Sequence, residues 1–206
     1  MKGKFITFEG TEGVGKSTQT RLLAEYLEKT GQPYIITREP GGDKIAEKIR
    51  RIILDADNVD MADETEALLY AAARAQHVKN VILPALKEGK IVLCDRFVHS
   101  SIAYQCYGRG LPLQFVLDVN AYALKNCPPD CVVLMEMSPK DAFARKGGAD
   151  KTDRLEQSGD EFFEKVNKAY EDMRNDREVL SIDPVGTKEE VLQRLINGLK
   201  ERGLIK

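Results

Sequence analysis

The chain has 206 residues, of which 42% are hydrophobic and 31% are charged, and this balance is typical of a folded globular protein rather than a disordered or membrane-embedded one. Its 31 Lys and Arg residues nearly balance 33 Asp and Glu residues, so no excess of positive charge indicates binding to nucleic acid or to a membrane surface. The length suits one domain over residues 1–206, and four cysteines without a recognisable secretory leader favour reduced thiols in the cytoplasm.

Apolar runs and helical periodicity alternate along the chain. Short apolar runs predict five strands, at residues 4–8, 34–37, 91–94, 131–137 and 179–182. Apolar residues at helical spacing predict helices at 17–29, 44–54, 63–87, 113–124, 161–174 and 188–200. Pro84 either kinks the third of these helices or begins a new helical turn, because proline lacks a backbone donor. Apolar strands that alternate with helices predict an α/β fold, with a five-stranded parallel sheet covered on both faces.

A glycine-rich segment follows the first predicted strand. It matches the pattern G-x-x-x-x-G-K-[ST] and stands between a strand and a helix, as a phosphate-binding P-loop requires; it reads Gly10-Thr11-Glu12-Gly13-Val14-Gly15-Lys16-Ser17. Its backbone N–H groups and the helix start attract anions, Lys16 offers a positive charge to the β and γ phosphates, and Ser17 would ligate Mg²⁺. A chance glycine turn is the alternative, which the complete match disfavours.

Charged residues follow two other predicted strands. Asp95 and Arg96 come directly after strand 91–94, and Arg38 comes after strand 34–37. The carboxyl ends of parallel strands are where such sheets bind their ligands. A carboxylate there could hold Mg²⁺, and the planar fork of an arginine suits a second phosphate group. The alternative for either arginine is an ion pair with a neighbouring carboxylate.

Residues 145–154 combine glycines with positive charge between two helical stretches. The cations are Arg145, Lys146, Lys151 and Arg154. We predict a lid over about 145–156 that brings a cation onto a transferring phosphoryl group and excludes water. A solvated charged loop is the alternative.

Several motifs are more specific than the P-loop. In their order and spacing they resemble the thymidylate kinase family over nearly the whole chain. They are Thr7-Phe8-Glu9-Gly10, Arg38-Glu39-Pro40-Gly41-Gly42, Asp95-Arg96, Ser100-Ser101-Ile102-Ala103-Tyr104-Gln105 and Asp153-Arg154-Leu155-Glu156. The resemblance implies a P-loop NTPase fold, transfer of the ATP γ-phosphoryl group to dTMP, a requirement for Mg²⁺ and a homodimer.

The resemblance also implies residue roles. Gly10 to Thr18 would bind ATP, with Ser17 and Asp95 at the metal. Glu12 would meet the 3′-hydroxyl of dTMP, and Tyr70 would stack on thymine. The acceptor phosphate would contact Arg38, Arg74 and Arg96. The base and deoxyribose would be surrounded by Ser101, Tyr104 and Gln105, with Tyr104 disfavouring ribose.

Catalysis would rest on positive charge rather than on a protein nucleophile. Gly13 stands where some family members place an arginine, which implies that the lid supplies the catalytic charge. The expected catalytic residues are Lys16, Arg96, Arg145 and Arg154, with Lys146 and Lys151 as weaker candidates.

One residue departs from the family pattern, and two other functions stay open. Asp43 stands where threonine is usual, and its charge would repel an acceptor phosphate unless the side chain points away or meets Lys44. The alternatives are a kinase for another pyrimidine monophosphate and a nucleotide-binding module without transfer. A guanine-specific switch would carry Asn-Lys-x-Asp, whereas Asn167-Lys168 continues with Ala-Tyr.

Overall fold

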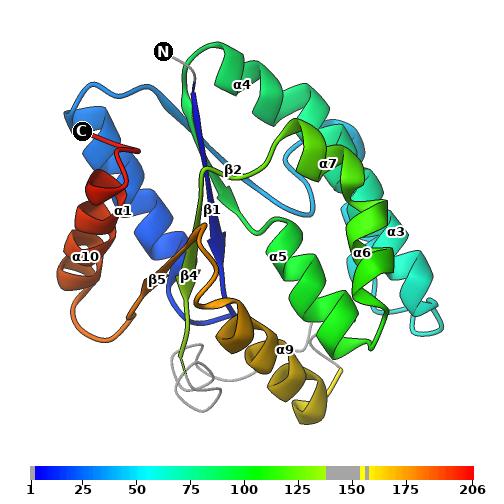
Figure 1. Ribbon diagram of the computed structural model, residues 1–206. Helices are drawn as coiled ribbons and strands as arrows, with labels where there is room; N and C mark the ends of the chain where they lie inside the picture. The colour runs from blue at the N-terminus through cyan, green and yellow to red at the C-terminus, as the bar shows by residue number, and fades with distance from the viewer. Residues whose placement is uncertain (1–2, 138–153, 156–157) are drawn as a thin grey trace.

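The computed structural model describes residues 3–137, 154–155 and 158–206 of the chain (Figure 1). Its five strands form one parallel sheet in the order β2-β3-β1-β4-β5, which confirms the predicted α/β fold and strand set. The strands are β1 (Lys4–Glu9), β2 (Tyr34–Arg38), β3 (Ile91–Asp95), β4 (Cys131–Met135) and β5 (Val179–Ile182). Most of the predicted lid lies outside the described residues.

Helices cover both faces of this sheet. On one side lie α1 (Lys16–Lys29) and α10 (Lys188–Glu201). The helices on the other side are α3 (Asp63–His77), α4 (Leu83–Lys87), α5 (Val98–Ser101), α6 (Leu113–Val119), α7 (Ala121–Asn126) and α9 (Asp160–Met173). The remaining helix, α2 (Lys44–Leu54), packs against α3.

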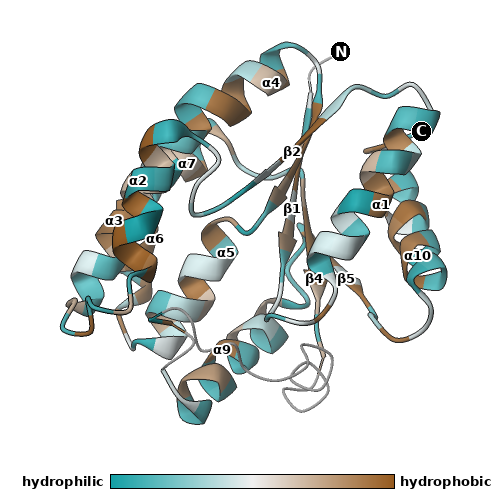
Figure 2. Ribbon diagram, turned by 180° about the vertical axis from the view of Figure 1, so that it is seen from behind, coloured by the Kyte–Doolittle hydropathy of each residue, from teal (hydrophilic) through white to brown (hydrophobic). Residues whose placement is uncertain are grey.

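Side chains along the strands alternate between the two helical layers. In β1, Ile6 and Phe8 join the core shared with α1 and α10, whereas Phe5 joins the core on the other face. The neighbouring β3 divides in the same way, with Leu93 on the first side and Val92 on the second. Burying each such side chain contributes roughly 1.5–3 kcal/mol. Figure 2 shows the result, with apolar strands between helices of mixed polarity.

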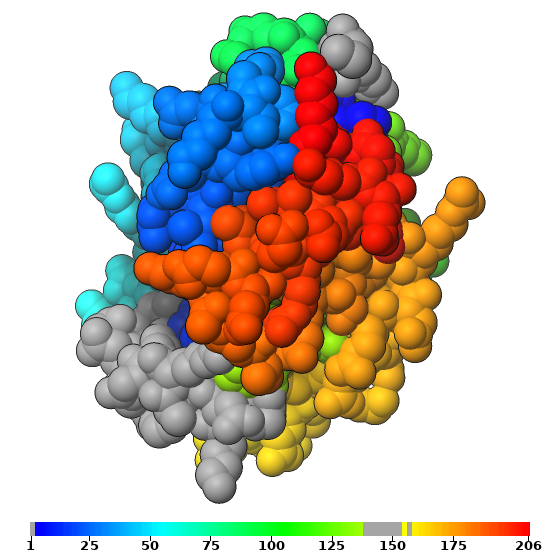
Figure 3. Space-filling model, turned by 90° about the vertical axis from the view of Figure 1, so that its left-hand side faces the viewer, coloured from blue at the N-terminus to red at the C-terminus, as the bar shows by residue number. Residues whose placement is uncertain are grey.

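The layer of α1 and α10 also holds the C-terminal segment. Figure 3 shows α10 packed beside α1 on this face. The helix α10 begins at a capping box, in which Thr187 and Glu190 each bond the other's backbone N–H. Past its end, Leu204 and Ile205 are buried in the same core. Within the described ranges, no helix is both long and apolar enough to cross a bilayer.

The predicted helix at 63–87 is one helical run with a change of winding. After α3, residues Val78–Ile82 form the π-helix η1, in which the N–H of Leu83 bonds to the carbonyl oxygen of Val78. Pro84 then lies in the first turn of α4, where a missing N–H costs nothing. The prediction of a new helical turn at Pro84 is therefore confirmed.

One other prediction of a helix needs correction, and one helical segment was not predicted. The expected helix at 113–124 is divided into α6 and α7 at Asn120, whose backbone leaves helical geometry and whose side chain is buried. No element was predicted between the strand at 91–94 and the helix at 113–124, where the structure has α5 followed by the π-helix η2 (Ile102–Gly108). Of these two segments, η2 packs against α9 and α6.

Parallel strands bring their carboxyl ends to one edge of the sheet. In the β2–β3 pairing Arg38 lies opposite Asp95, and in the β1–β3 pairing Phe8 lies opposite the same residue. The segments that follow β1, β2 and β3 therefore emerge side by side.

Candidate active site

The P-loop joins β1 to α1 by a tight turn of the backbone. Gly10 has a φ of 127°, and a Cβ there would lie 2.0 Å from the carbonyl oxygen of Met135, so only glycine fits. Gly15, with φ 101°, is the N-cap of α1 and supplies no side-chain acceptor to the first helical turn. The N–H groups of that turn therefore remain available to an anion.

Lys16 is buried at the start of α1. Its Nζ donates hydrogen bonds to the carbonyl oxygens of Gly10 at 2.8 Å and Thr11 at 2.7 Å. Burial, followed by the positive charge of Arg96, lowers the pKa of Lys16 from 10.5 to about 7. A phosphate beside this amine would favour the charged form and raise the pKa again.

A cavity of about 970 Å³, here called the cradle cavity, opens in front of the P-loop. Its lining residues are Glu12, Gly13, Gly15, Lys16, Ser17, Thr18, Arg38, Glu39, Arg50, Asp95 and Arg96. The structure thus brings predicted nucleotide-binding residues together with both arginines that follow β2 and β3.

Two hard oxygen ligands lie close together in the cradle cavity. Ser17 Oγ is 3.4 Å from Asp95 Oδ2. The other carboxylate oxygen, Asp95 Oδ1, is buried and has no hydrogen-bond partner among the described residues. A buried oxygen without a donor is costly unless a cation or water satisfies it. A hydroxyl and a carboxylate are ligands that suit Mg²⁺, so this donor set fits the ion.

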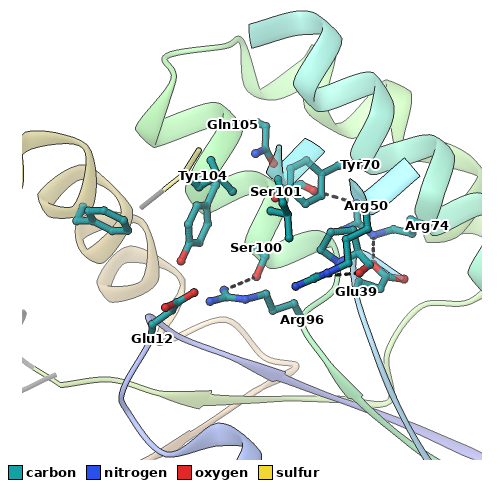
Figure 4. Close-up of a pocket in the computed structure, with 14 residues that line it drawn as sticks. Glu12, Glu39, Arg50, Tyr70, Arg74, Arg96, Ser100, Ser101, Tyr104 and Gln105 are labelled. Carbon is teal, nitrogen blue, oxygen red and sulfur yellow. Dashed lines mark hydrogen bonds and ion pairs between the residues drawn. The ribbon is translucent and has the colours of Figure 1, made fainter. Parts of the chain in front are cut away.

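A second cavity, of about 630 Å³, lies beside the first and is here called the tyrosine cavity (Figure 4). Tyr70 comes from α3 and Tyr104 from η2. The other lining residues are Glu12, Glu39, Pro40, Arg50, Leu54, Arg74, Arg96, Ser100, Ser101, Gln105, Leu155 and Phe163. Four of these also line the cradle cavity: Glu12, Glu39, Arg50 and Arg96. The two cavities therefore meet at charged side chains.

Arg96 stands at this junction. Its Nη1 donates to Ser100 Oγ at 3.1 Å and to the carbonyl oxygen of Gly10 at 3.3 Å. The guanidinium carbon is 5.1 Å from the centre of the Tyr104 ring, a distance suited to a cation–π contact. Arg96 therefore connects the backbone of the P-loop with the wall of the tyrosine cavity.

Comparison with known proteins identifies the family. The family model described as Thymidylate kinase matches residues 8–195. The thymidylate kinase of Finegoldia magna is 47% identical over 98% of this chain and 100% of its own length. That of Symbiobacterium thermophilum is 45% identical over 96% of this chain and 94% of its own. The chain belongs to the thymidylate kinase family.

A solved structure agrees with this assignment. The crystal structure of thymidylate kinase from Ehrlichia chaffeensis superposes with a TM-score of 0.78 at 29% identity, over 97% of this chain and 100% of that one. The likeness covers nearly the whole of both chains, and this confirms the predicted P-loop NTPase fold.

The three arginines predicted at the acceptor phosphate of a thymidylate kinase lie in different surroundings. Arg96 lines both cavities. Arg38 lines only the cradle cavity, is 47% exposed and pairs with Glu47 at 2.9 Å. Arg74 lines the tyrosine cavity but is 2% exposed. A phosphate contact by each of them stays a prediction, and Arg96 has the most suitable position.

Arg74 is held by a buried hydrogen-bond network. Its Nε donates to Glu39 Oε2 at 2.6 Å, and its Nη2 donates to the carbonyl oxygen of Phe97 at 2.9 Å. Its Nη1 donates to Ser101 Oγ and Asn120 Oδ1. Four of the five N–H groups of a guanidinium are thus used inside the protein. Arg74 consequently fixes the wall of the tyrosine cavity, whatever it contacts in a complex.

Glu39 also contacts His77. The distance from His77 Nδ1 to Glu39 Oε1 is 2.9 Å, and His77 Nε2 lies 2.6 Å from Thr37 Oγ1. A Cβ on Gly42 would approach this pair within 2.6 Å, which explains the glycine. Cys94 lies close enough to complete a possible metal cluster, but Glu39 is already paired with Arg74. The cluster is therefore better explained as a hydrogen-bond network.

Arg154, one of the predicted lid cations, is anchored away from both cavities. It forms a buried ion pair with Glu66 of α3, and its Nε donates to the carbonyl oxygen of Ile53 at 3.2 Å. Glu66 also accepts from Arg109 and Gln105. A catalytic contact by Arg154 would require this pair to open. Arg145, Lys146 and Lys151 lie outside the described residues.

Asp43 does not face the acceptor cavity. Its Oδ1 accepts hydrogen bonds from the N–H groups of Ile45 at 2.8 Å and Ala46 at 3.4 Å, which makes it the N-cap of α2. The Ile45 N–H group is the main cause that lowers the pKa of Asp43. Repulsion between Asp43 and an acceptor phosphate is thus avoided because the side chain points away from the cavity, and not by an ion pair with Lys44.

Sequence reasoning missed several residues of the site. Arg50 of α2 lines both cavities, and Nη1 of this residue donates to the carbonyl oxygen of Pro40 at 2.9 Å. Ser100 contacts Arg96, and Phe163 of α9 lines the tyrosine cavity. For Ser100 the signal was its place four residues after Arg96 in a matched motif; Arg50 and Phe163 carry no local signal.

Proposed function

We propose that the protein phosphorylates dTMP with ATP as the donor, giving dTDP and ADP. In this reaction the bond from the γ-phosphorus to the bridging oxygen of ADP breaks, and a bond forms to a phosphate oxygen of dTMP. The observation that carries the proposal is the junction of the two cavities at Arg96, beside Lys16 and the P-loop. Membership of the thymidylate kinase family supports the choice of acceptor.

The donor nucleotide is proposed to lie along the cradle cavity. The backbone of Gly10 to Thr18 binds its phosphates, and Lys16 places a positive charge beside the β and γ groups. Ser17 and Asp95 would hold Mg²⁺, which when bound neutralises charge on the phosphate oxygens. The unpartnered Oδ1 of Asp95 supports this assignment.

The acceptor is proposed to lie in the tyrosine cavity. Tyr70 stacks on thymine, and Ser101 and Gln105 surround the base. Tyr104 lies against the sugar, where a 2′-hydroxyl would collide, and Glu12 meets the 3′-hydroxyl. The apolar contribution of Leu54 and Phe163 to the lining suits a base rather than a second phosphate.

The acceptor phosphate is proposed to lie at Arg96, with Arg38 approaching from the cradle side. Bidentate binding by a guanidinium fixes both the position and the orientation of the phosphate. Charge that develops during transfer meets Lys16 and Arg96, and a lid cation is proposed to complete this set. Arg145 is the leading lid candidate because Arg154 is already paired with Glu66.

A homodimer in the cytoplasm completes the proposal. Ile45 and Ile52 lie two turns apart on α2 and are 51% and 49% exposed, and Leu68 on the neighbouring α3 is 51% exposed. Exposed apolar side chains grouped on packed helices favour a protein contact. Light scattering after size exclusion would test this, with Ile52→Glu expected to give a monomer.

Product analysis tests the proposed reaction. With ATP, Mg²⁺ and dTMP, we expect chromatography and ³¹P NMR to show dTDP and ADP formed in equal amounts, and no dTDP after addition of EDTA. Formation of ADP without dTDP would reduce the protein to an ATPase or a nucleotide-binding module and would contradict the proposal.

A further inference from the structure

The backbone at Arg96 has an unusual conformation. Its φ is 71°, and it is the one non-glycine residue with a positive φ in the described parts of the chain. A bulky side chain keeps such a conformation only where its surroundings hold it, and these cases cluster at functional sites. The direction in which the Arg96 side chain leaves the backbone therefore depends on the groups that fix this turn.

Four hydrogen bonds hold the two peptide groups around Arg96, one of them from the N–H of Glu39 to the carbonyl oxygen of Asp95 at 2.9 Å. The N–H of Arg96 donates to the carbonyl oxygen of Phe8 at 2.9 Å. Its carbonyl oxygen accepts from the thiol of Cys94 at 3.2 Å. The next N–H, that of Phe97, donates to Glu9 Oε1 at 2.7 Å. Among these four partners, only Glu9 also bonds Ser100, whose hydroxyl oxygen accepts from the Arg96 guanidinium.

The second oxygen of Glu9 reaches those residues. Ser100 Oγ lies 2.6 Å from Glu9 Oε2, and Tyr170 Oη of α9 lies 3.3 Å from the same oxygen. Glu9 is fully buried, and its carboxylate accepts from all three donors.

The Glu9 carboxylate also decides which way the Ser100 hydroxyl points. A hydroxyl has one hydrogen, and the short contact directs it at Glu9. The oxygen lone pairs of Ser100 are then left to accept from Arg96 Nη1, at 3.1 Å. Glu9 thus fixes Arg96 twice, through the backbone at Phe97 and through the side chain of Ser100.

We propose that Glu9, which no catalytic step uses, is the positioning residue for Arg96 and thereby sets the affinity for the acceptor phosphate. The proposal rests on the proposed function, because it takes Arg96 to bind the phosphate of dTMP. If Glu9 had only a structural role, its substitution would destabilise the fold without a specific effect on binding of the acceptor phosphate.

The difference between dTMP and thymidine separates these two roles. The two molecules share base and sugar, so the ratio of their dissociation constants reports the phosphate contact alone. In Glu9→Gln the amide nitrogen donates to Ser100 Oγ, so the Ser100 hydrogen turns away from residue 9 and the amide competes with Arg96 Nη1 for the lone pairs of this oxygen. We expect calorimetry to show that the dissociation constant of thymidine divided by that of dTMP falls by about tenfold. The affinity for thymidine itself should stay within about twofold of wild type.

Two further variants control the test. Ser100→Ala leaves the carboxylate in place and removes the link to Arg96, so we expect the ratio to fall by about three- to tenfold. This variant decides the matter if Glu9→Gln does not fold. Tyr170→Phe removes a donor to the same Glu9 oxygen and the 3.1 Å contact of Tyr170 Oη with Ser100 Oγ. It leaves the bonds from Glu9 to Phe97 and Ser100 and from Ser100 to Arg96, so the ratio should stay within about twofold.

Each result bears on the proposal. A smaller ratio in Glu9→Gln and Ser100→Ala, but not in Tyr170→Phe, supports it. Equal weakening of dTMP and thymidine would overturn it and leave Glu9 a structural role. Wild-type protein that binds thymidine and dTMP equally would overturn the proposed function together with this inference, and so the two failures can be told apart.

Discussion

The P-loop is one continuous stretch of backbone, whereas the tyrosine cavity is lined by side chains from segments far apart in the sequence. The P-loop consists of glycines and the start of α1, a combination that can bind the phosphates of any nucleotide. The tyrosine cavity depends on buried contacts between α3, η2 and the turns after β2 and β3. The comparison teaches that the proposed donor site is built locally in the sequence, while the proposed acceptor site depends on the packing of the whole fold.

The largest expected effect comes from the residue that both regions share. We expect Arg96→Ala to lower dTMP phosphorylation by at least a hundredfold in kcat/KM, or roughly 3 kcal/mol, because a bidentate phosphate contact is lost. Arg21→Ala, on the exposed side of α1, should leave the rate unchanged. Steady-state kinetics decides the point, and an Arg96→Ala rate within a few fold of wild type would remove Arg96 from the acceptor site.

The next effect concerns stability and separates the buried arginine from the exposed one. Arg74→Ala leaves Glu39 buried without its cation, and we expect the free energy of unfolding to fall by about 3–5 kcal/mol. Arg38→Ala breaks a pair at the surface and should change it by less than about 1 kcal/mol. Urea unfolding without ligands measures both, and equal losses would show that the Arg74 network does not support the fold.

Lys16 allows a test of the cradle by pH. Burial lowers its pKa to about 7, so near pH 8 the free protein carries the amine mostly neutral, and a bound phosphate should restore the proton. We expect ATP binding near pH 8 to take up about 0.9 proton, measured by calorimetry in buffers of different ionisation enthalpy. In Lys16→Arg, which stays charged, uptake should disappear. Equal uptake in both proteins would place the titrating group elsewhere.

The smallest effect is expected at Asp43, which lies in neither region. Asp43→Ala removes the N-cap of α2 and should lower Tm by about 2–4 °C, whereas Asp43→Ser should keep it. The KM for dTMP should not change in either variant, because the carboxylate is directed at Ile45 and Ala46. A clear fall in this KM for Asp43→Ala would mean that the charge does act on the acceptor.

The same comparison explains what the sequence could predict. The P-loop was found in full because its function lies in backbone conformation, which glycines and one lysine reveal locally. The acceptor residues were predicted only through motifs that resemble a family, and their ion pairs were not predicted. Arg74 pairs with Glu39, and Arg154 pairs with Glu66, in each case across a long stretch of sequence. Such pairings follow from tertiary packing, and no spacing rule contains them.

Two features of the fold were not predicted from the sequence, for a similar reason. The helical segment at 98–108 includes the π-helix η2, whose wider winding breaks the spacing that indicates an α-helix. The break at Asn120 arises where its side chain turns inward to Val116 and Arg74, a contact made by folding. Strand positions, in contrast, were predicted because buried parallel strands are apolar throughout.

The most direct test of the central claim, that the tyrosine cavity selects dTMP beside an unselective cradle, is a comparison of acceptors. Coupled ADP release would be measured with ATP, Mg²⁺ and, in turn, dTMP, dUMP, UMP, CMP, AMP and GMP. We predict fastest turnover with dTMP and poor turnover with every ribonucleotide. Turnover as fast with UMP or CMP would contradict selection by this cavity, and no dependence on any acceptor would leave only the phosphate cradle.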